Sequence, residues 1–226
     1  YLLLLGGLNG DEKKRVLVIA VLFVFAAIFW SAFEQTPTAL NLFALDFTER
    51  MVGTFEIPAT WFQSVNSFWI ILLAPVMSVI WEGLGRKNLE PSSPRKQAIG
   101  LLFLGLGYLL IAYGVKDVIG KTSMLWLIGL YFLHTIGELA VSPIGLSLVN
   151  KLAPARFASI LMGVWFVSNA AANKFGGTLG ALLPSEGATS ILGYEINNLH
   201  EFFMVFVVMS VVAAVLLFML APWMEK

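Results

Sequence analysis

Glu138 and Glu34 are carboxylate residues inside long apolar segments of this sequence. Glu138 lies near the middle of the run 123–149, in the string GELAVSPIG, and Glu34 lies in IFWSAFEQTPTALN. A charged side chain at the depth of a lipid bilayer costs about 2.5 to 3.5 kcal/mol on translocon-insertion scales, so it normally faces a cavity or a partner. Both residues therefore mark a path for an ion, a proton or a substrate.

Polar and aromatic residues accompany these carboxylates. Trp30 precedes Glu34 by four residues and Ser142 follows Glu138 by four, so each pair shares one face of a helix. Asn66 lies near the middle of another apolar segment. A buried carboxylate holds an ammonium group, hydroxyl and amide groups satisfy polar donors and acceptors, and tryptophans supply apolar walls. The set suits recognition of a small zwitterion.

Each of these residues also has a structural interpretation. The two glutamates could belong to a structural ion pair, and a tryptophan in a membrane protein is most often an anchor or a packing residue. His134 is interpreted as a hydrogen-bonded core histidine rather than a proton relay. Burial favours the protonated form of a carboxylate, so either glutamate could exchange a proton for a substrate amine, but the residues alone leave proton coupling undecided.

The composition identifies an integral membrane protein. The 226 residues are 58% hydrophobic and only 12% charged, with a mean hydropathy of +0.84, more than the core of a soluble domain needs. The chain has no cysteine and two histidines, so neither a disulfide framework nor a dedicated metal site is expected. A net charge of zero excludes a basic nucleic-acid binder.

Apolar segments of about 17 to 25 residues, the length that a bilayer core demands, occur six times. Their continuous apolar character favours helices over barrel strands, which alternate polar and apolar residues. The sequence therefore predicts an all-α fold with six transmembrane helices in one bundle. The predicted helices cover about 16–45, 59–81, 98–115, 123–149, 157–183 and 202–223.

Prolines, glycines and basic residues add detail to this arrangement. Pro37, Pro75 and Pro143 lie within or at the edge of the spans, where each removes a backbone hydrogen bond. The glycines of GLGYLLIAYG and KFGGTLGALL are expected at close-packing positions. Basic residues gather on one side of the spans, which predicts that both ends of this segment are cytoplasmic. These residues are Lys13, Lys14, Arg15, Arg86, Lys87, Arg95, Lys96, Lys151, Arg156 and Lys226.

Three strings cover much of the chain: FWSAFEQTPTALNLFA, WFQSVNSFWIILLAPV and YFLHTIGELAVSPIGLSLVNKLAPARFASILMGVWF. They resemble the C-terminal half of the proton-dependent oligopeptide transporters, a family within the major facilitator superfamily. The most specific signal is GELAVSPIGLS, with Trp165 following 27 residues after Glu138. The resemblance implies two six-helix bundles that move di- and tripeptides together with protons by alternating access.

The resemblance also implies roles for individual residues. Glu138 corresponds to the carboxylate that holds the peptide amino terminus, and Glu34 to an acidic residue of the outer gate that takes part in proton coupling. Leu146 resembles an apolar residue of the inner gate. Two polar pocket residues and two pocket walls complete the set: Asn66, Ser142, Trp30 and Trp165. Protons are then the coupling ion, and no further cofactor is expected.

The family's motifs of the first and fifth helices are absent from these 226 residues. Those motifs belong to an N-terminal six-helix bundle, which is implied as the missing partner and would supply basic groups for the peptide carboxylate. On this template residues 1–15 are the end of a linker and a cytoplasmic basic segment, and residues 16–226 are the C-terminal bundle. The implied location is the inner cell membrane.

Other functions remain open at this stage. Relatives of the family carry nitrate or other small solutes, so an amino-acid-like cargo on the same fold is an alternative. A membrane enzyme could use the two carboxylates and His134 as acid and base. The sequence lacks HExxH and nucleophile-elbow motifs, so it favours a protein that is not an enzyme. An accessory subunit would gain little from deep carboxylates.

Overall fold

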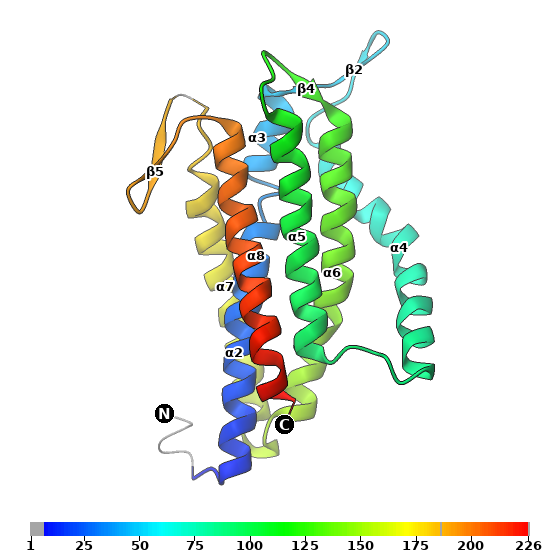
Figure 1. Cartoon of the computed structure of the whole chain (residues 1–226), viewed down its shortest axis with the longest axis vertical. Helices are drawn as coiled ribbons and strands as arrows, with labels where there is room; N and C mark the ends of the chain where they lie inside the picture. Colours follow the sequence, from blue (N-terminus) through cyan, green and yellow to red (C-terminus); the bar gives the residue numbers. More distant parts are fainter. Residues whose placement is uncertain (1–6, 186, 226) are drawn as a thin grey trace.

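The computed structural model describes residues 7–185 and 187–225 (Figure 1). Within these residues six helices are long and apolar enough to cross a membrane, which confirms the all-α membrane fold. The six are α2 (Gly10–Phe33), α4 (Trp61–Arg86), α5 (Ser93–Val115), α6 (Met124–Leu152), α7 (Ala158–Gly180) and α8 (Leu199–Met224). The short helix α3 (Ala39–Asp46) follows α2, and the 3₁₀ helix η1 (Ala155–Phe157) precedes α7.

Short strands form three pairs among the described residues. The strand β1 (Thr48–Glu49) pairs in parallel with β4 (Thr122–Ser123). Two antiparallel pairs join β2 (Met51–Val52) to β3 (Phe55–Glu56) and β5 (Thr189–Ile191) to β6 (Tyr194–Ile196). All three pairs lie at one end of the bundle, which we call the strand end. The start of α2 and the end of α8 lie toward the opposite end, which we call the terminal end (Figure 1).

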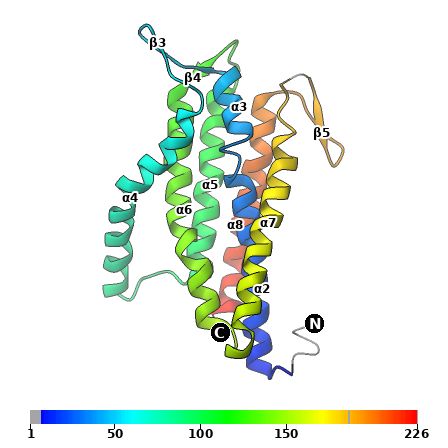
Figure 2. The same cartoon turned by 180° about the vertical axis from the view of Figure 1, so that it is seen from behind.

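The bundle is built around α5. This helix packs between α6 and α8, while α2 packs mainly against α7. Helix α4 contacts α6 and leans away from the other helices toward the terminal end, as the two opposite views show (Figures 1 and 2). Only Phe62 of α4 is buried. The faces of α4 that lack a neighbour in this bundle are therefore open to lipid or to another protein segment.

Aromatic stacking fills the centre. Tyr108 of α5 is fully buried and stacks on Phe206 of α8, with ring centroids 4.6 Å apart. Its hydroxyl donates a hydrogen bond to the carbonyl of Ala32 at the end of α2, at 2.6 Å. One side chain thus joins α5, α8 and α2, and it satisfies its only polar atom inside the apolar core.

Glycines bring α5 and α6 into backbone contact. A Cβ atom built on Gly100 would lie 2.8 Å from the carbonyl oxygen of Gly137, and one built on Gly137 would lie 2.7 Å from that of Gly100. Small residues allow this approach between membrane helices. Close packing is also seen at other glycines of the two quoted strings, because Gly107 meets the ring of His134 and Gly176 meets the carbonyl of Ser31. Gly177 is the exception, since a Cβ atom there would meet no atom within 4 Å.

The predicted span 16–45 is two helices rather than one. Helix α2 ends at Phe33, the chain turns through residues 34–38, and α3 begins at Ala39. Pro37 has no backbone N–H to continue the helical ladder, which explains the position of the interruption. By contrast, Pro75 lies inside α4 and Pro143 inside α6, and both helices continue through them.

Several other helices extend beyond the predicted spans, while α7 ends three residues before the predicted end at 183. Helix α2 starts at Gly10, six residues before the predicted span, because Asn9 and Glu12 form a reciprocal capping box. The Asn9 side chain accepts from the Glu12 N–H at 2.8 Å, and the Asn9 N–H donates to the Glu12 carboxylate at 3.0 Å. Asn198 caps α8 in a similar way. Apolar length alone cannot locate such ends.

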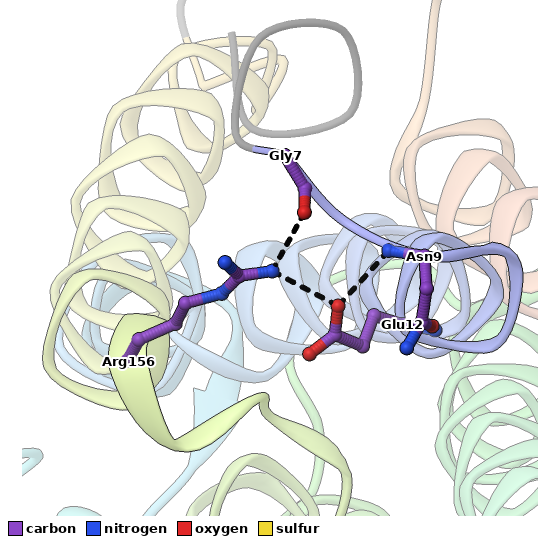
Figure 3. Close-up of polar contacts among 4 residues, drawn as sticks. All are labelled: Gly7, Asn9, Glu12 and Arg156. Carbon is purple, nitrogen blue, oxygen red and sulfur yellow. Dashed lines mark hydrogen bonds and ion pairs between the residues drawn. The ribbon is translucent and has the colours of Figure 1, made fainter.

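Arg156 of η1 joins this cap to the connection between α6 and α7 (Figure 3). Its Nη2 atom donates to the Gly7 carbonyl at 2.9 Å and to the Glu12 carboxylate at 3.0 Å. The side chain is half exposed, so the pair itself adds little stability. Its effect is to fix the direction in which the chain enters α2.

A second set of polar contacts joins the terminal ends of α4, α5 and α8. Lys96 lies over the Trp81 ring at 4.6 Å and hydrogen-bonds to Glu90, and this hydrogen bond lowers the pKa of the Glu90 carboxyl. The neighbouring Arg95 forms a forked ion pair with Glu225, with N···O distances of 2.9 and 3.0 Å. The terminal ends of α4, α5 and α8 are held together by these contacts.

We expect Gly137→Ala to lower the melting temperature of the protein and Gly83→Ala to leave the melting temperature unchanged or slightly higher. The first substitution forces a methyl group against the α5 backbone, an overpacking that typically costs about 1–3 kcal/mol. A Cβ atom on Gly83 meets no atom within 4 Å, so alanine there gains helix propensity. Thermal unfolding of the protein in detergent measures both. Equal melting temperatures would contradict the contact between α5 and α6.

Candidate functional site

Glu138 and Asn66 form the centre of the candidate site. The Asn66 amide of α4 donates to the Glu138 carboxylate of α6 at 2.9 Å and to the Thr135 hydroxyl at 3.1 Å. Thr135 in turn donates to the carbonyl of Tyr131 at 2.7 Å. Both Asn66 and Glu138 are partly buried. Two residues predicted separately from the sequence are therefore brought together, 72 positions apart in the chain.

Thr135 is a member of this network that the sequence analysis missed. It is fully buried and lies three residues before Glu138, so the two side chains share a helical face. Its hydroxyl donates to the helix backbone and accepts from Asn66, which holds the asparagine in a fixed orientation. The spacing of Thr135 from Glu138 was the available signal, but threonines in membrane helices commonly bond to their own helix backbone.

Ser142 and Pro143 lie one turn beyond Glu138 and are exposed. Pro143 lines a groove of about 420 Å³ between α4 and α6. The groove continues along α4 toward the terminal end, where it reaches Glu82 and Glu90. The Asn66–Glu138 contact is thus followed by an opening between the same two helices. Ser142 is exposed but is not among the residues that line this groove.

Glu34 and Trp30 lie where α2 ends. Glu34 is the residue that caps α2 and is partly buried. Trp30 packs edge-on against Phe29 and Phe33, with ring centroids 5.3 and 5.4 Å apart, and its buried indole N–H has no hydrogen-bond partner among the described residues. The Phe33 ring lies 6.1 Å from that of His134 in α6, so this end of α2 lies beside the turn that precedes Glu138.

The charges of the two carboxylates have no counter-ion in the described part of the chain. The ion pairs found there join residues near the ends of the bundle, and neither Glu34 nor Glu138 takes part in one. The purely structural ion pair considered for both residues is therefore not formed within these ranges. A cation that meets either carboxylate comes from a ligand, a proton or another protein segment.

His134 is buried but differs from the expected hydrogen-bonded core histidine. Its ring packs 4.7 Å from that of Tyr108, and a Cβ atom on Gly107 would lie 2.4 Å from the imidazole. Neither ring nitrogen has a hydrogen-bond partner among the described residues. The imidazole fills the space left by a glycine, so its observed contribution is to the packing of α5 against α6.

Trp165 lies in packed surroundings rather than beside Glu138. The indole is 8% exposed, packs 5.2 Å from the Phe23 ring of α2 and covers Gly145 of α6. Gly145 is two helical turns beyond Glu138. In the described arrangement Trp165 therefore joins α7 to α2 and α6, and its role as a pocket wall stays a prediction. Leu146 belongs to α6, but its side chain lies outside the described residues.

We expect Trp165→Ala to cost about 3–5 kcal/mol, the usual loss when a buried aromatic side chain is removed. Trp223→Ala is the matched control, because that tryptophan of α8 is 40% exposed. Melting temperatures of the two variants in detergent would separate them. Similar melting temperatures would mean that Trp165 is not part of a packed contact, and its side chain would then be free to line a pocket.

The fold and the site together define a multi-pass membrane protein with polar side chains held between its helices. A family model described as the POT family matches residues 8–191. The chain is 45% identical over 184 residues to the peptide transporter YePEPT of Yersinia enterocolitica, covering 80% of this chain and 36% of that protein. The chain belongs to the POT family.

Further comparisons agree with this assignment. Dipeptide and tripeptide permease A of Chromobacterium violaceum is 32% identical over 223 residues, covering 97% of this chain and 44% of the permease. A mutant of a peptide transporter POT in complex with alafosfalin superposes with a TM-score of 0.88 at 33% identity, covering 99% of this chain and 44% of that one. The resemblance drawn from the sequence is confirmed. The chain spans less than half the length of these relatives.

Proposed function

We propose that this chain is the C-terminal bundle of a proton-coupled symporter of di- and tripeptides that works by alternating access. The observation that carries the proposal is Glu138, a partly buried carboxylate in a membrane helix whose contact is the Asn66 amide and not a cation. A peptide ammonium would neutralise it through charge-assisted hydrogen bonds. The names of the relatives, which describe peptide transporters and permeases, support the same cargo.

In this mechanism Asn66 orients the Glu138 carboxylate, and the exposed Ser142 hydroxyl meets polar groups of the peptide backbone. Trp30 and Trp165 act as apolar walls, and Leu146 belongs to the inner gate. Glu34 binds a proton in one part of the cycle and pairs with a basic group of the other bundle in another part. Binding of the proton and of the peptide is thereby coupled to the conformational change.

A second six-helix bundle completes the transporter. It would precede residues 1–15, which are then the end of a linker and a basic segment, and would supply the cation for the peptide carboxylate. The basic residues at the terminal end, among them Lys13, Lys14, Lys151 and Arg156, support a cytoplasmic location for that end, with the protein in the inner cell membrane. Protons and the lipid bilayer are the other partners.

An amino-acid-like cargo is the second candidate. One POT family transporter that superposes with a TM-score of 0.83 at 32% identity, covering 100% of this chain and 45% of that one, is in complex with 5-aminolevulinic acid. That ligand also carries an amine, so Glu138 would serve it equally well. Competition by dipeptides, single amino acids and nitrate against a labelled dipeptide ranks these cargoes. Membership of the POT family argues against the enzyme alternative.

We expect Glu138→Gln to weaken dipeptide binding by about one to two orders of magnitude, the value of a hydrogen bond to a charged group. Glutamine still accepts from Asn66, so the protein should fold and express normally. Glu195→Gln is the control, because Glu195 is an exposed carboxylate of β6 that does not line the groove between α4 and α6. Binding is measured on the full-length parent protein in detergent. Unchanged affinity of Glu138→Gln would contradict the assigned role.

We expect Glu34→Gln to abolish accumulation of dialanine driven by a pH gradient while counterflow exchange continues. Glutamine cannot take up and release a proton, so the peptide still crosses but is no longer driven. Both modes are measured with the full-length parent protein in liposomes. Accumulation equal to that of the wild type would remove Glu34 from proton coupling, and no uptake by the folded wild type would point to another cargo.

A further inference from the structure

Gln35 is a fully buried amide at the point where the first membrane helix is interrupted. It follows Glu34, the residue that caps α2, and precedes Pro37 in the turn that leads to α3. Its exposed fraction is 0%. A side chain of this polarity is rarely buried without a full set of partners, so its contacts indicate what the turn needs.

The amide group of Gln35 makes three hydrogen bonds. Nε2 donates to the carbonyl of Ser31 in α2 and to the carbonyl of Gly176 in α7, both at 2.9 Å, and Oε1 accepts from the Thr38 hydroxyl at 3.2 Å. In a continuous helix the Ser31 carbonyl would accept from the backbone N–H of residue 35. That N–H instead bonds to the Ala32 carbonyl at 3.4 Å. The side chain therefore replaces the backbone bond that the interruption removes.

Two glycines let α7 approach this amide. A Cβ atom on Gly176 would lie 3.0 Å from the Ser31 carbonyl oxygen, and one on Gly180 would lie 2.9 Å from Gln35 Oε1. Both glycines are buried and lie one turn apart on α7. The backbone of α7 thus runs directly against the break, and Gln35 is the side chain that hydrogen-bonds across it.

We propose that Gln35 is a positioning residue for Glu34: its amide fastens the break in α2 to α7, so that the carboxylate and this part of α7 move together. The Gln35 side chain is held by the three hydrogen bonds described above. The preceding residue, Glu34, is held to α2 by its backbone N–H, which donates to the Trp30 carbonyl at 2.9 Å. The functional part of this inference rests on the proposed proton coupling.

The reason for this coupling lies in the cost of unpaired polar groups. If the amide were lost, the Ser31 and Gly176 carbonyls would both lose a donor in a region that water does not reach. The turn could then recover partners only by shifting away from α7. A small displacement of a group that must meet a proton and a counter-ion has a large effect on rate, because the productive geometry is narrow.

The test compares Gln35→Met with Gln97→Met in the full-length parent protein. Methionine matches glutamine in size and lacks the amide. Gln97 is a matched control, because it is 2% exposed and its amide donates from α5 to the Leu22 carbonyl of α2 at 3.0 Å, far along α2 from Glu34. Both variants lose a buried bond between helices, so both should show lower melting temperatures.

We expect the ratio of gradient-driven dialanine accumulation to counterflow exchange to fall about tenfold or more in Gln35→Met. Gln97→Met should keep the wild-type ratio. Hydrogen exchange, which needs no transported cargo, should be faster over residues 34–42 and 172–182 in Gln35→Met alone. Equal ratios in the two variants overturn the positioning role, and equal hydrogen exchange overturns the link between the break and α7.

The two proposals fail in different ways. If the wild type accumulates no peptide while hydrogen exchange still separates the variants, the proposed function is wrong and the link to α7 stands. If Gln35→Met does not fold, Thr38→Val replaces it. Valine removes the hydroxyl that donates to Gln35 Oε1 at 3.2 Å, and the same hydroxyl lies 3.4 Å from the Glu34 and Gln35 carbonyls. A ratio below that of Gln97→Met in Thr38→Val supports the inference, and a wild-type ratio overturns it.

Discussion

Lipid hydrocarbon offers no hydrogen bonds, so every polar group at membrane depth is paired within the protein or is costly. This constraint shapes both unusual regions of the chain. At the break in α2, the Gln35 side chain provides the donor that the helix backbone has lost. Between α4 and α6, the Asn66 amide serves the Glu138 carboxylate and the Thr135 hydroxyl at once. Regular helices supply the remaining backbone bonds.

The packing of the helices follows from a few small residues. Gly100 and Gly137 bring α5 and α6 together, and Gly176 and Gly180 bring α7 against the end of α2. Because a bilayer provides little hydrophobic driving force between helices, such close backbone contacts are a main source of their association. Helix α4 has no comparable glycine contact and meets α6 through the polar pair and through the Trp69 ring, which packs 5.0 Å from that of Phe132. Glu138 thus contacts a helix of which only Phe62 is buried.

The two carboxylates lack a counter-charge in the described part of the chain. Neither Glu34 nor Glu138 forms an ion pair within residues 7–185 and 187–225, and the relatives are more than twice as long as the part of them that this chain matches. A charge at membrane depth needs a partner or a cavity. In the proposed function, a peptide ammonium, a proton or a basic group of the other bundle would be that partner.

The sequence by itself determined the membrane class, the helical fold and the family. Apolar length and composition are local properties, and the strings around Glu34 and Glu138 carry the family pattern. It also identified Glu138 and Asn66, since a polar residue in an apolar run is visible without a structure. The interruption at Pro37 was visible as a signal, but the span was still predicted as one helix.

Only the tertiary structure decided which of these residues meet. The bond between Asn66 and Glu138 joins two helices, and the contact of Gln35 with Gly176 spans 141 positions of the chain. Trp165 shares no contact with Glu138, because the crossing of α7 with α2 and α6 places its ring on Gly145. Periodicity shows which face of a helix is polar, whereas the neighbour of that face depends on helix packing, which is a property of the whole bundle.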